Sequence, residues 1–364
     1  MTVSTLIILS VTFTISLLCT GLVIVLYGRS RLLRKRENDL NSVQTAHLVP
    51  APRIGGVPIV IAFIIGITLS NGSNISCPNC PKLLLSIIPI FIAGLIEDLN
   101  GHARPRFRLI AAAISGSLFV LLFGQWLLRT ELPGLDIMMQ WTPFAITFSL
   151  FVTVGISHSF NLIDGVNGLA GITGSFAALA LAVISHQESL FAQRDIMLFL
   201  SVAILAFLLF NYPFGKIFLG DAGAYVIGHV LSWTAISILW NAPQVSPWAI
   251  LLIFFWPVAD TLLAVIRRIT NKMPILQPDR LHFHQLAMRA LEIIFLGRNK
   301  RKFTNPLTTL VLLPFVISPI LVGVFLATET TKAIVALAIF IFLFIVTYKL
   351  GMNIARGVQR RRKL

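Results

Sequence analysis

The sequence predicts an all-α, polytopic membrane protein, and three observations lead to this fold class. The 364 residues are 56% hydrophobic and only 12% charged, with a mean hydropathy of +0.87, whereas soluble domains carry about 25% charged residues. The apolar residues come in long runs instead of short alternating segments. Basic residues gather in every second connection between these runs, which is the asymmetry described by the positive-inside rule.

Eleven apolar runs are candidate transmembrane helices, and most reach the roughly 20 residues needed to cross about 30 Å of hydrocarbon. They cover about 3–27, 55–70, 82–97, 107–128, 142–160, 166–185, 195–212, 217–240, 247–267, 305–327 and 333–355. The second and third runs are the shortest, so we expect ten or eleven crossings. The first run is longer than the apolar core of a signal peptide, and its basic residues follow it, so we expect no cleavage.

The chain is expected to form one membrane-embedded domain over 1–364, with its main loops at 28–54 and 268–304. If the basic segment after the first run lies inside the cell, the loops alternate from there. All but four of the 29 Lys and Arg residues then lie inside, and the N-terminus lies outside and the C-terminus inside. The outer four are Lys82, Arg129, Arg194 and Lys332.

The net charge of +15 follows from this inner location, and the basic tail 360–363 suits anionic lipid headgroups better than nucleic acid. Cys77 and Cys80 fall in the expected outer loop 71–81, where oxidation can occur. A small surface disulfide and two free thiols are both compatible with this spacing.

Acidic residues mark the inner connections: Glu97 with Asp98, then Asp164, Asp221 and Asp279. A charge at membrane depth costs a few kcal/mol or more, so ionisable groups kept there are usually functional. Carboxylates gathered at one membrane face suggest a site that holds a divalent cation and handles phosphates.

The segments around Asp164 and Asp221 are the most informative. Asn161, Asp164 and Asn167 recur at every third residue, so on a helical turn they would share one face. Asp221 stands between small residues, an uncrowded position that suits Mg²⁺, which keeps several waters and takes one or two carboxylates. Lys216 is placed to meet phosphate. The structural alternative for the Asp164 segment is a solvent-exposed loop. For the other segment it is Asp221 as an N-cap and Lys216 with its charge extended toward water.

Two other segments have plainer alternatives. Arg53 lies in 50–58, where prolines stiffen the entry to the second run and a Gly pair lets backbone approach a ligand; a common turn would look the same. Glu97 and Asp98 end the third run, although a helix C-terminus disfavours anions. They are either a solvated helix end balanced by Arg104, Arg106 and Arg108 or carboxylates kept for catalysis.

The fifth inner segment contains His282 and His284, preceded by Arg280. Two His and an Asp could bind zinc, but no third nitrogen or sulfur ligand stands at a usual spacing. We therefore expect this group to bind anionic oxygens, with Asp260 supporting the loop.

These segments resemble the polyprenyl-phosphate N-acetylhexosamine-1-phosphate transferase superfamily, which belongs to glycosyltransferase family 4. Five family motifs occur in order: Pro-Arg-x-Gly-Gly at 52–56, Asp-Asp at 97–98, Asn-x-x-Asp-Gly-x-Asp-Gly-Leu at 161–169, Phe-Leu-Gly-Asp-x-Gly at 218–223 and His-x-His-His at 282–285. Three residues depart from these motifs: Glu97 and Asn167 stand where the family has Asp, and Gln285 stands where it has His. The last two changes remove a charge and an imidazole, so no direct metal or catalytic role is expected at 167 or 285.

The resemblance implies transfer of a HexNAc-1-phosphate from a UDP-amino sugar to undecaprenyl phosphate, with release of UMP. It also implies Mg²⁺, or Mn²⁺ in its place, and an active site that faces the cytoplasm from the bacterial inner membrane. Asp98, Glu97 and Asp164 are assigned to catalysis, and Asp221 and Asp164 to the metal. Of the pair, Asp98 is expected to activate the lipid phosphate and Glu97 to assist the charge balance; the alternative for Asp98 is positioning of the metal. The expected substrate-binding residues are Arg53, Asn161, Asn167, Asn211, Lys216, Arg280, His282 and His284.

Two alternative functions remain at this level. A phospho-MurNAc-pentapeptide transferase of peptidoglycan synthesis is disfavoured by Gln285 and by Gly101, where that enzyme would have Lys. A polytopic transporter or lipid flippase would carry its charges near mid-helix, whereas here they stand at helix ends on one face. The sequence leaves open the sugar, the glycan pathway (O-antigen, capsule or another envelope polymer) and the oligomeric state, a homodimer included.

Overall fold

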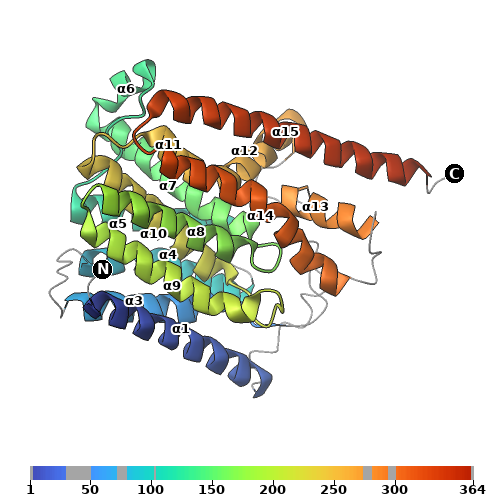
Figure 1. Cartoon of the computed structure of the whole chain (residues 1–364), viewed down its shortest axis with the longest axis horizontal. Helices are drawn as coiled ribbons and strands as arrows, with labels where there is room; N and C mark the ends of the chain where they lie inside the picture. The colour runs from blue at the N-terminus through green and yellow to red at the C-terminus, as the bar shows by residue number, and fades with distance from the viewer. Residues whose placement is uncertain are drawn as a thin grey trace.

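The computed structural model describes residues 3–29, 51–71, 80–101, 104–273, 281–293 and 301–361. All regular elements within these residues are helices, which confirms the all-α fold class. Most of the helices run along the bundle axis, and the N-terminus and the C-terminus lie at opposite ends of the bundle (Figure 1).

Nine helices in the described residues are long and apolar enough to cross a membrane. They are α1 (Val3–Arg29), α4 (Cys80–Asn100), α5 (Pro105–Phe123), α7 (Thr142–Ile163), α8 (Leu169–Gln187), α9 (Phe191–Asn211), α10 (Gly220–Asn241), α14 (Arg301–Phe325) and α15 (Thr330–Arg361). The bent pair α11 (Pro247–Ile253) and α12 (Phe255–Thr270) adds a tenth if it is one span, and α3 (Gly56–Asn71) is a shorter apolar helix. Each of the eleven predicted runs thus contains helix. The physical reason is that a chain in hydrocarbon must satisfy its backbone polar groups internally.

The run 247–267 departs from the expectation of one straight helix. It breaks at Phe254 into α11 and α12, which meet at 83°. Pro257, in the first turn of α12, has no N–H to donate to the carbonyl of Ile253, and this weakens the helix at the break. One face of α12 buries Asp260 and Arg268, whereas Leu262 is 54% exposed.

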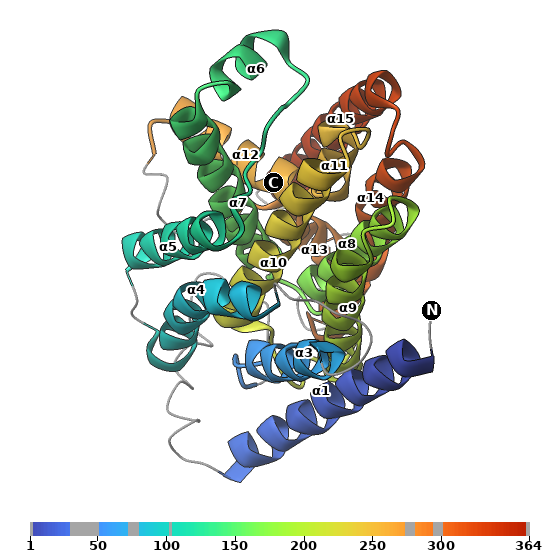
Figure 2. The ribbon, with the colours of Figure 1, turned by 90° about the vertical axis from the view of Figure 1, so that its left-hand side faces the viewer.

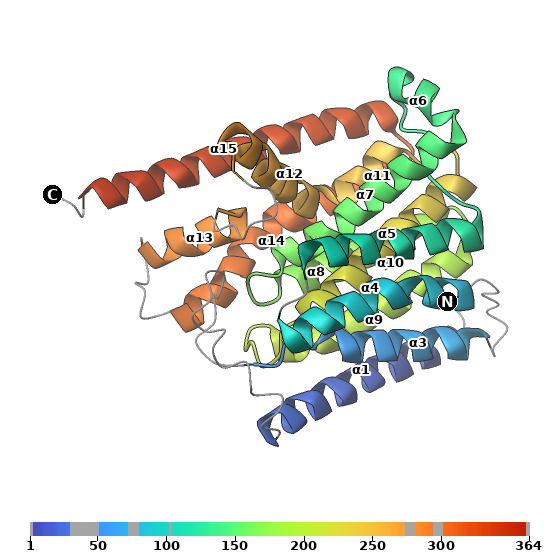
Figure 3. The same ribbon diagram turned by 180° about the vertical axis from the view of Figure 1, so that it is seen from behind.

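Two short helices were not expected from the sequence. They are α6 (Pro133–Met139) and α13 (Phe283–Leu291), both in connections between apolar runs. Beyond the bundle, α15 continues past its neighbours toward the C-terminus (Figure 3).

Helix α10 lies at the centre of the bundle, surrounded by α3, α4, α5, α7, α8 and α9 (Figure 2). The whole apolar stretch of α10 is buried by these neighbours. Small residues allow close approach: a Cβ at Gly228 would lie 2.5 Å from the Cα of Ser157 on α7. The first turn of α10, which carries Asp221, is therefore fixed by packing from several sides.

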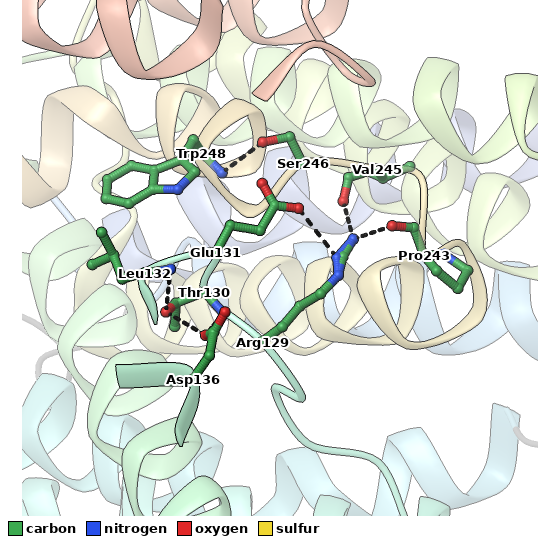
Figure 4. A network of polar contacts seen from close by, with 9 residues as sticks. All are labelled: Arg129, Thr130, Glu131, Leu132, Asp136, Pro243, Val245, Ser246 and Trp248. Carbon is green, nitrogen blue, oxygen red and sulfur yellow. Dashed lines mark hydrogen bonds and ion pairs between the residues drawn. The ribbon is translucent and has the colours of Figure 1, made fainter. Parts of the chain in front are cut away.

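A polar network closes the end of the bundle that carries the N-terminus (Figure 4). Arg129 donates to the carbonyls of Pro243 and Val245, the latter at 2.7 Å, and lies 3.4 Å from Glu131. Asp136 of α6 accepts from the backbone N–H and hydroxyl of Thr130 at 2.6 and 2.7 Å. This network ties the α5–α6 connection to the α10–α11 connection.

Candidate active site

Asp98 stands at the C-terminal end of α4 and caps the N-terminus of α10. Its Oδ1 accepts from the backbone N–H of Asp221 at 2.8 Å, and its Oδ2 accepts from that of Ala222 at 2.9 Å. These N–H groups are among the first four of the helix, which lack partners within it. The buried carboxylate of Asp98 therefore fixes the helix turn that carries Asp221.

The Pro-Arg-x-Gly-Gly segment is hydrogen-bonded to the residues just before α10. Phe218 donates to the carbonyl of Pro52 at 2.8 Å, and Gly55 and Gly56 donate back to the carbonyls of Phe218 and Leu219 at 2.9 and 2.8 Å. The sequence interpretation that this Gly pair allows a close backbone approach fits this geometry, since a Cβ at Gly56 would lie 2.2 Å from the nitrogen of Gly223.

Gly220 joins the first, second and fourth motifs. Its φ of +75° belongs to the left-handed region, and a Cβ there would lie 1.9 Å from the carbonyl oxygen of Arg53 and 2.7 Å from both carboxylate oxygens of Asp98. Only glycine fits at this position, where the three motif segments meet.

Asp221 is held from two neighbouring helices. Arg108 of α5 forms an ion pair with its Oδ2, and Asn161 of α7 donates to its Oδ1 at 2.9 Å. The hydroxyl of Tyr225, one turn along α10, donates to Oδ1 of Asn161 at 3.5 Å. The side chain of Asp221 keeps 20% of its surface exposed, so it is accessible to a ligand.

Asp164 follows the last residue of α7 and lies close to the same cluster. The pKa of its carboxyl is raised to about 7, mainly because the group is buried; Arg53 and the backbone N–H of Gly220 favour the charged form, and the charge of Asp221 opposes it. The charge of Asp221 thus acts against a charge on Asp98 and on Asp164, and Arg53 and Arg108 balance this cluster in part.

Asn167 and Asn211 connect the backbones of the site loops. Asn211 accepts from the N–H of Gly168 and donates to the carbonyl of Ile217, both at 2.7 Å. The side-chain amide of Asn167 donates to the carbonyl of Pro213 at 3.1 Å, while its Oδ1 has no partner among the described residues. These amides hold the 161–168 and 211–217 segments side by side.

The backbone of Asn167 is in turn held by α14. Its N–H donates to Oδ1 of Asn305 at 2.7 Å, and its carbonyl accepts from the hydroxyl of Thr309 at 2.6 Å. Asn305 is 3% exposed and Thr309 is fully buried. A helix far along the chain therefore clamps the loop that contains Asp164.

The His-x-His segment lies against the Asp164 loop. A Cβ at Gly165 would lie 2.2 Å from Nε2 of His284. Asp260 binds Nδ1 of His282 at 3.0 Å and the N–H of Phe283 at 2.9 Å, which is the supporting role predicted for it. Burial lowers the pKa of His284 to about 4, so this imidazole is neutral at pH 7 and neither of its nitrogens has a hydrogen-bond partner in the described chain.

Two sequence-predicted residues contribute less directly to this arrangement. Lys216 is exposed, with its ammonium 5.3 Å from the ring centroid of Phe214. Glu97 is half-buried, and its charge acts on Arg108 and Tyr225. Arg280 lies outside the described residues, as do Cys77 and Asp279.

Sequence reasoning missed His158 and Tyr225, and it considered Arg108 only as a balancing charge. The ring of His158 lies 4.8 Å from that of Tyr225. Both residues had a usable signal: His158 precedes Asn161 by three residues and Tyr225 follows Asp221 by four, so each shares a helix face with a predicted site residue.

The carboxylates suit a metal that the substrate helps to bind. Within the described residues, no three His, Cys, Asp or Glu side chains form a complete metal site. Mg²⁺ usually takes only one or two carboxylates together with substrate phosphates and water. The partly exposed Asp221 and the neighbouring Asp164 fit that donor set.

Comparison with known proteins supports the motif resemblance. Residues 80–239 match the model of glycosyl transferase family 4. A Bacillus subtilis protein named "probable undecaprenyl-phosphate N-acetylglucosaminyl 1-phosphate transferase" is 28% identical over 76% of this chain and 76% of its own length. A Mycobacterium leprae decaprenyl-phosphate N-acetylglucosaminephosphotransferase is 27% identical over 76% of this chain and 74% of its own.

A more distant match has a different donor in its name. The phospho-N-acetylmuramoyl-pentapeptide-transferase of Streptococcus sanguinis is 24% identical over 75% of this chain and 85% of its own length. Motif order, helical architecture and these similarities agree. The chain is similar to polyprenyl-phosphate N-acetylglucosamine-1-phosphate transferases, and its segment 80–239 matches the glycosyl transferase family 4 model.

Proposed function

We propose that this protein transfers a HexNAc-1-phosphate from a UDP-amino sugar to undecaprenyl phosphate, releases UMP, and so primes an O-antigen, capsule or other cell-envelope glycan. The observation that carries the proposal is the convergence of Asp98, Asp164 and Asp221 with Arg53 and Arg108 at one end of an apolar bundle. Such a place lets a membrane-bound phosphate meet a water-soluble nucleotide.

The reaction is a phosphoryl transfer. An oxygen of the lipid phosphate attacks the phosphorus that bears the sugar, and the bond between the two donor phosphates breaks, so that the electron pair leaves with UMP. Positioning and charge stabilisation supply most of the catalysis in such reactions. When bound, Mg²⁺ would neutralise the pyrophosphate oxygens, and Asp221 and Asp164 are the residues that would hold it.

Asp98 is proposed to position the metal site instead of acting on the lipid phosphate itself. Both of its oxygens accept backbone N–H groups of α10, an arrangement that orients Asp221. Glu97 contributes negative charge beside Arg108. Arg53 and Arg108 are proposed to bind phosphate oxygens, which guanidinium groups recognise well.

The donor is proposed to bind between the Asp164 loop and the His-x-His segment. His284 lies against Gly165, and a neutral imidazole can offer an N–H to a phosphate or sugar oxygen. Asn161, Asn167, Asn211, Lys216 and His282, with Arg280 outside the described residues, complete the proposed substrate-binding set. The proposed location is the bacterial inner membrane, with this end of the bundle in the cytoplasm, where UDP-sugars are made.

Transfer of radiolabel tests the proposal. Purified protein with undecaprenyl phosphate and Mg²⁺ is incubated with labelled UDP-GlcNAc, UDP-GalNAc, other UDP-amino sugars and UDP-MurNAc-pentapeptide in turn. We expect label in the butanol-extractable lipid from a UDP-amino sugar, together with release of UMP. Label from the pentapeptide donor alone would assign the chain to the peptidoglycan reaction, and no transfer from any donor would refute the proposal.

The same assay tests the metal. We expect a chelator to stop transfer and Mg²⁺ or Mn²⁺ to restore it, and Asp221→Asn to remove most activity, because a neutral amide is a poor ligand for a hard cation. Glu329→Gln is the matched control, since Glu329 is 52% exposed in the α14–α15 connection and pairs with the exposed Lys332 of α15. Normal turnover and metal dependence in Asp221→Asn would contradict the assignment.

A further inference from the structure

His158 places a free hydrogen-bond acceptor beside the carboxylate cluster. Its Nδ1 lies 3.0 Å from the carbonyl oxygen of Val154 on the preceding turn of α7. A carbonyl can only accept, so Nδ1 carries the proton and the neutral ring has its lone pair on Nε2. Nε2 is buried and has no hydrogen-bond partner among the described residues.

The surroundings of this ring belong to the proposed phosphate site. Tyr225 of α10 lies against it, and the charges of Arg108 on α5 and Asp221 on α10 act on it. Arg108 uses NH1 for Asp221, while its Nε is also buried without a partner in the described residues. The site therefore combines one unused donor, on Arg108, with one unused acceptor, on His158.

A buried polar atom without a partner costs about 1–3 kcal/mol, so both atoms favour a ligand that satisfies them together. A phosphate monoester with one proton is such a ligand. Its anionic oxygens accept from Arg108, and its P–OH donates to His158. Phosphate monoesters lose their second proton with a pKa of about 6, so this form is available near neutral pH.

We propose that His158 is the general base for the lipid phosphate, an inference that rests on the proposed transfer reaction. The P–OH proton moves to Nε2, which turns the imidazole into an imidazolium and the phosphate monoester into its dianion. The freed oxygen then forms the new bond to the donor phosphorus. As the bond between the donor phosphates breaks, the imidazolium gives its proton to the departing UMP phosphate.

This assignment agrees with the contacts of Asp98. That carboxylate is occupied by the N–H groups of Asp221 and Ala222, whereas Nε2 of His158 has no hydrogen-bond partner in the described part of the chain. The charged and titratable groups that act on His158 are Arg108, Asp221 and Tyr225, and Glu97 acts through Arg108 and Tyr225.

The pH profile of the transfer reaction distinguishes a base from a packing residue. His158→Gln removes the base and keeps a polar side chain, so the variant must use lipid phosphate that has already lost its second proton. We expect its kcat to fall about tenfold per pH unit below roughly pH 6, while wild-type kcat falls only at lower pH. At pH 8.5 the two should approach each other, with KM for the UDP-sugar unchanged.

Two controls complete the test. His186→Gln, at the exposed opposite end of α8, should reproduce the wild-type profile. A polyprenyl phosphorothioate, which loses its second proton more readily than the phosphate, should raise the variant-to-wild-type ratio at pH 6. His158→Asn serves as a second variant if thermal melting shows that His158→Gln does not fold.

The possible failures are separable. An equal loss at every pH, with no effect of the phosphorothioate, would overturn the role of His158 alone. Absence of transfer by the wild-type protein would overturn the proposed function and this step with it.

Discussion

At the scale of single residues, one buried carboxylate determines where another stands. Asp98 accepts two backbone N–H groups from the first turn of α10, and Asp221 is the first residue of that pair. Charge-assisted hydrogen bonds of this kind are about twice as strong as neutral ones. The orientation of the proposed metal ligand therefore depends on a residue 123 positions earlier in the chain.

Single substitutions of Asp98 and Glu97 should distinguish a residue that positions Asp221 from one that only balances charge. In Asp98→Asn the amide NH₂ would face a backbone N–H, so one hydrogen bond is lost and Asp221 loses its fixed orientation. We expect weaker Mn²⁺ binding by electron paramagnetic resonance and roughly 100-fold lower transfer, the upper end of the range for residues that orient metal ligands. Glu97→Gln should have a smaller effect on both. A larger loss in Glu97→Gln would exchange the two roles.

The neutral state of His284 predicts a pH dependence of stability. Its pKa falls from 6.5 in the unfolded chain to about 4 in the fold, so between these values the unfolded chain binds more protons. Stability should therefore decrease as pH falls through this window, by at most about 1.4 kcal/mol per pH unit. The melting temperature of the detergent-solubilised protein should drop less between pH 7.5 and pH 5 in His284→Gln than in wild type. An identical drop would contradict the prediction.

At the scale of elements, α14 extends the site beyond the segment that matches the family model. Asn305 and Thr309 are separated by one helical turn, and together they bind both backbone groups of Asn167. The loop they hold contains Asp164, and His284 packs against Gly165 in it. Helix α14 thus positions this loop through the hydrogen bonds of Asn305 and Thr309.

Adjacent threonines on α14 allow a matched test of this clamp. Both are fully buried, but Thr309 donates to Asn167, whereas Thr308 donates only to Thr304 within its own helix. Thr309→Val leaves the carbonyl of Asn167 without this partner, at a cost of about 1–3 kcal/mol. We expect a raised KM for the UDP-sugar and a higher Mg²⁺ requirement in Thr309→Val but not in Thr308→Val. Thr309→Ser should restore both, and equal effects of the two Val variants would refute the clamp.

At the scale of the whole molecule, the helix order brings the described parts of the predicted inner segments to one end. The α7–α8 and α9–α10 connections and α13 lie at the end toward which the C-terminus points, opposite the N-terminus and α6 (Figure 1). The Arg129 network closes the other end. The bundle thus carries Asp98, Asp164 and Asp221 at one end and the Arg129 network at the other, so the proposed site faces one side of a membrane.

Cysteine labelling tests which side that is. In a background where Cys19, Cys77 and Cys80 are replaced by Ser, single cysteines are introduced at Ser30, Asn299, Gln359 and Gln187. We expect the first three to resist a membrane-impermeant thiol reagent in intact cells and to react after lysis, because the basic loops should remain inside. Position 187, at the end of α8, should react in intact cells. Labelling of position 299 from outside would invert the topology.

The sequence by itself determined the long helices and most residues of the proposed site. Long apolar runs must form helices in hydrocarbon because every backbone polar group needs an internal partner, and the eleven predicted runs are all helical. The same runs placed Asp98, Asp164, Asp221 and the His-x-His segment at one end, where the structure brings them together. Local spacing was sufficient for these conclusions, because each depends on residues within one segment.

Only the tertiary structure decided what each side chain does. The cap that Asp98 forms on α10, the Arg108–Asp221 ion pair and the hold of Asn305 and Thr309 on Asn167 all join residues more than 100 positions apart. Such contacts depend on which helices pack together and at what rotation, and hydrophobic pattern does not encode rotation for helices that are apolar on all sides. For the same reason His158 looked like one more residue of an apolar helix until its free nitrogen was placed beside Arg108 and Asp221.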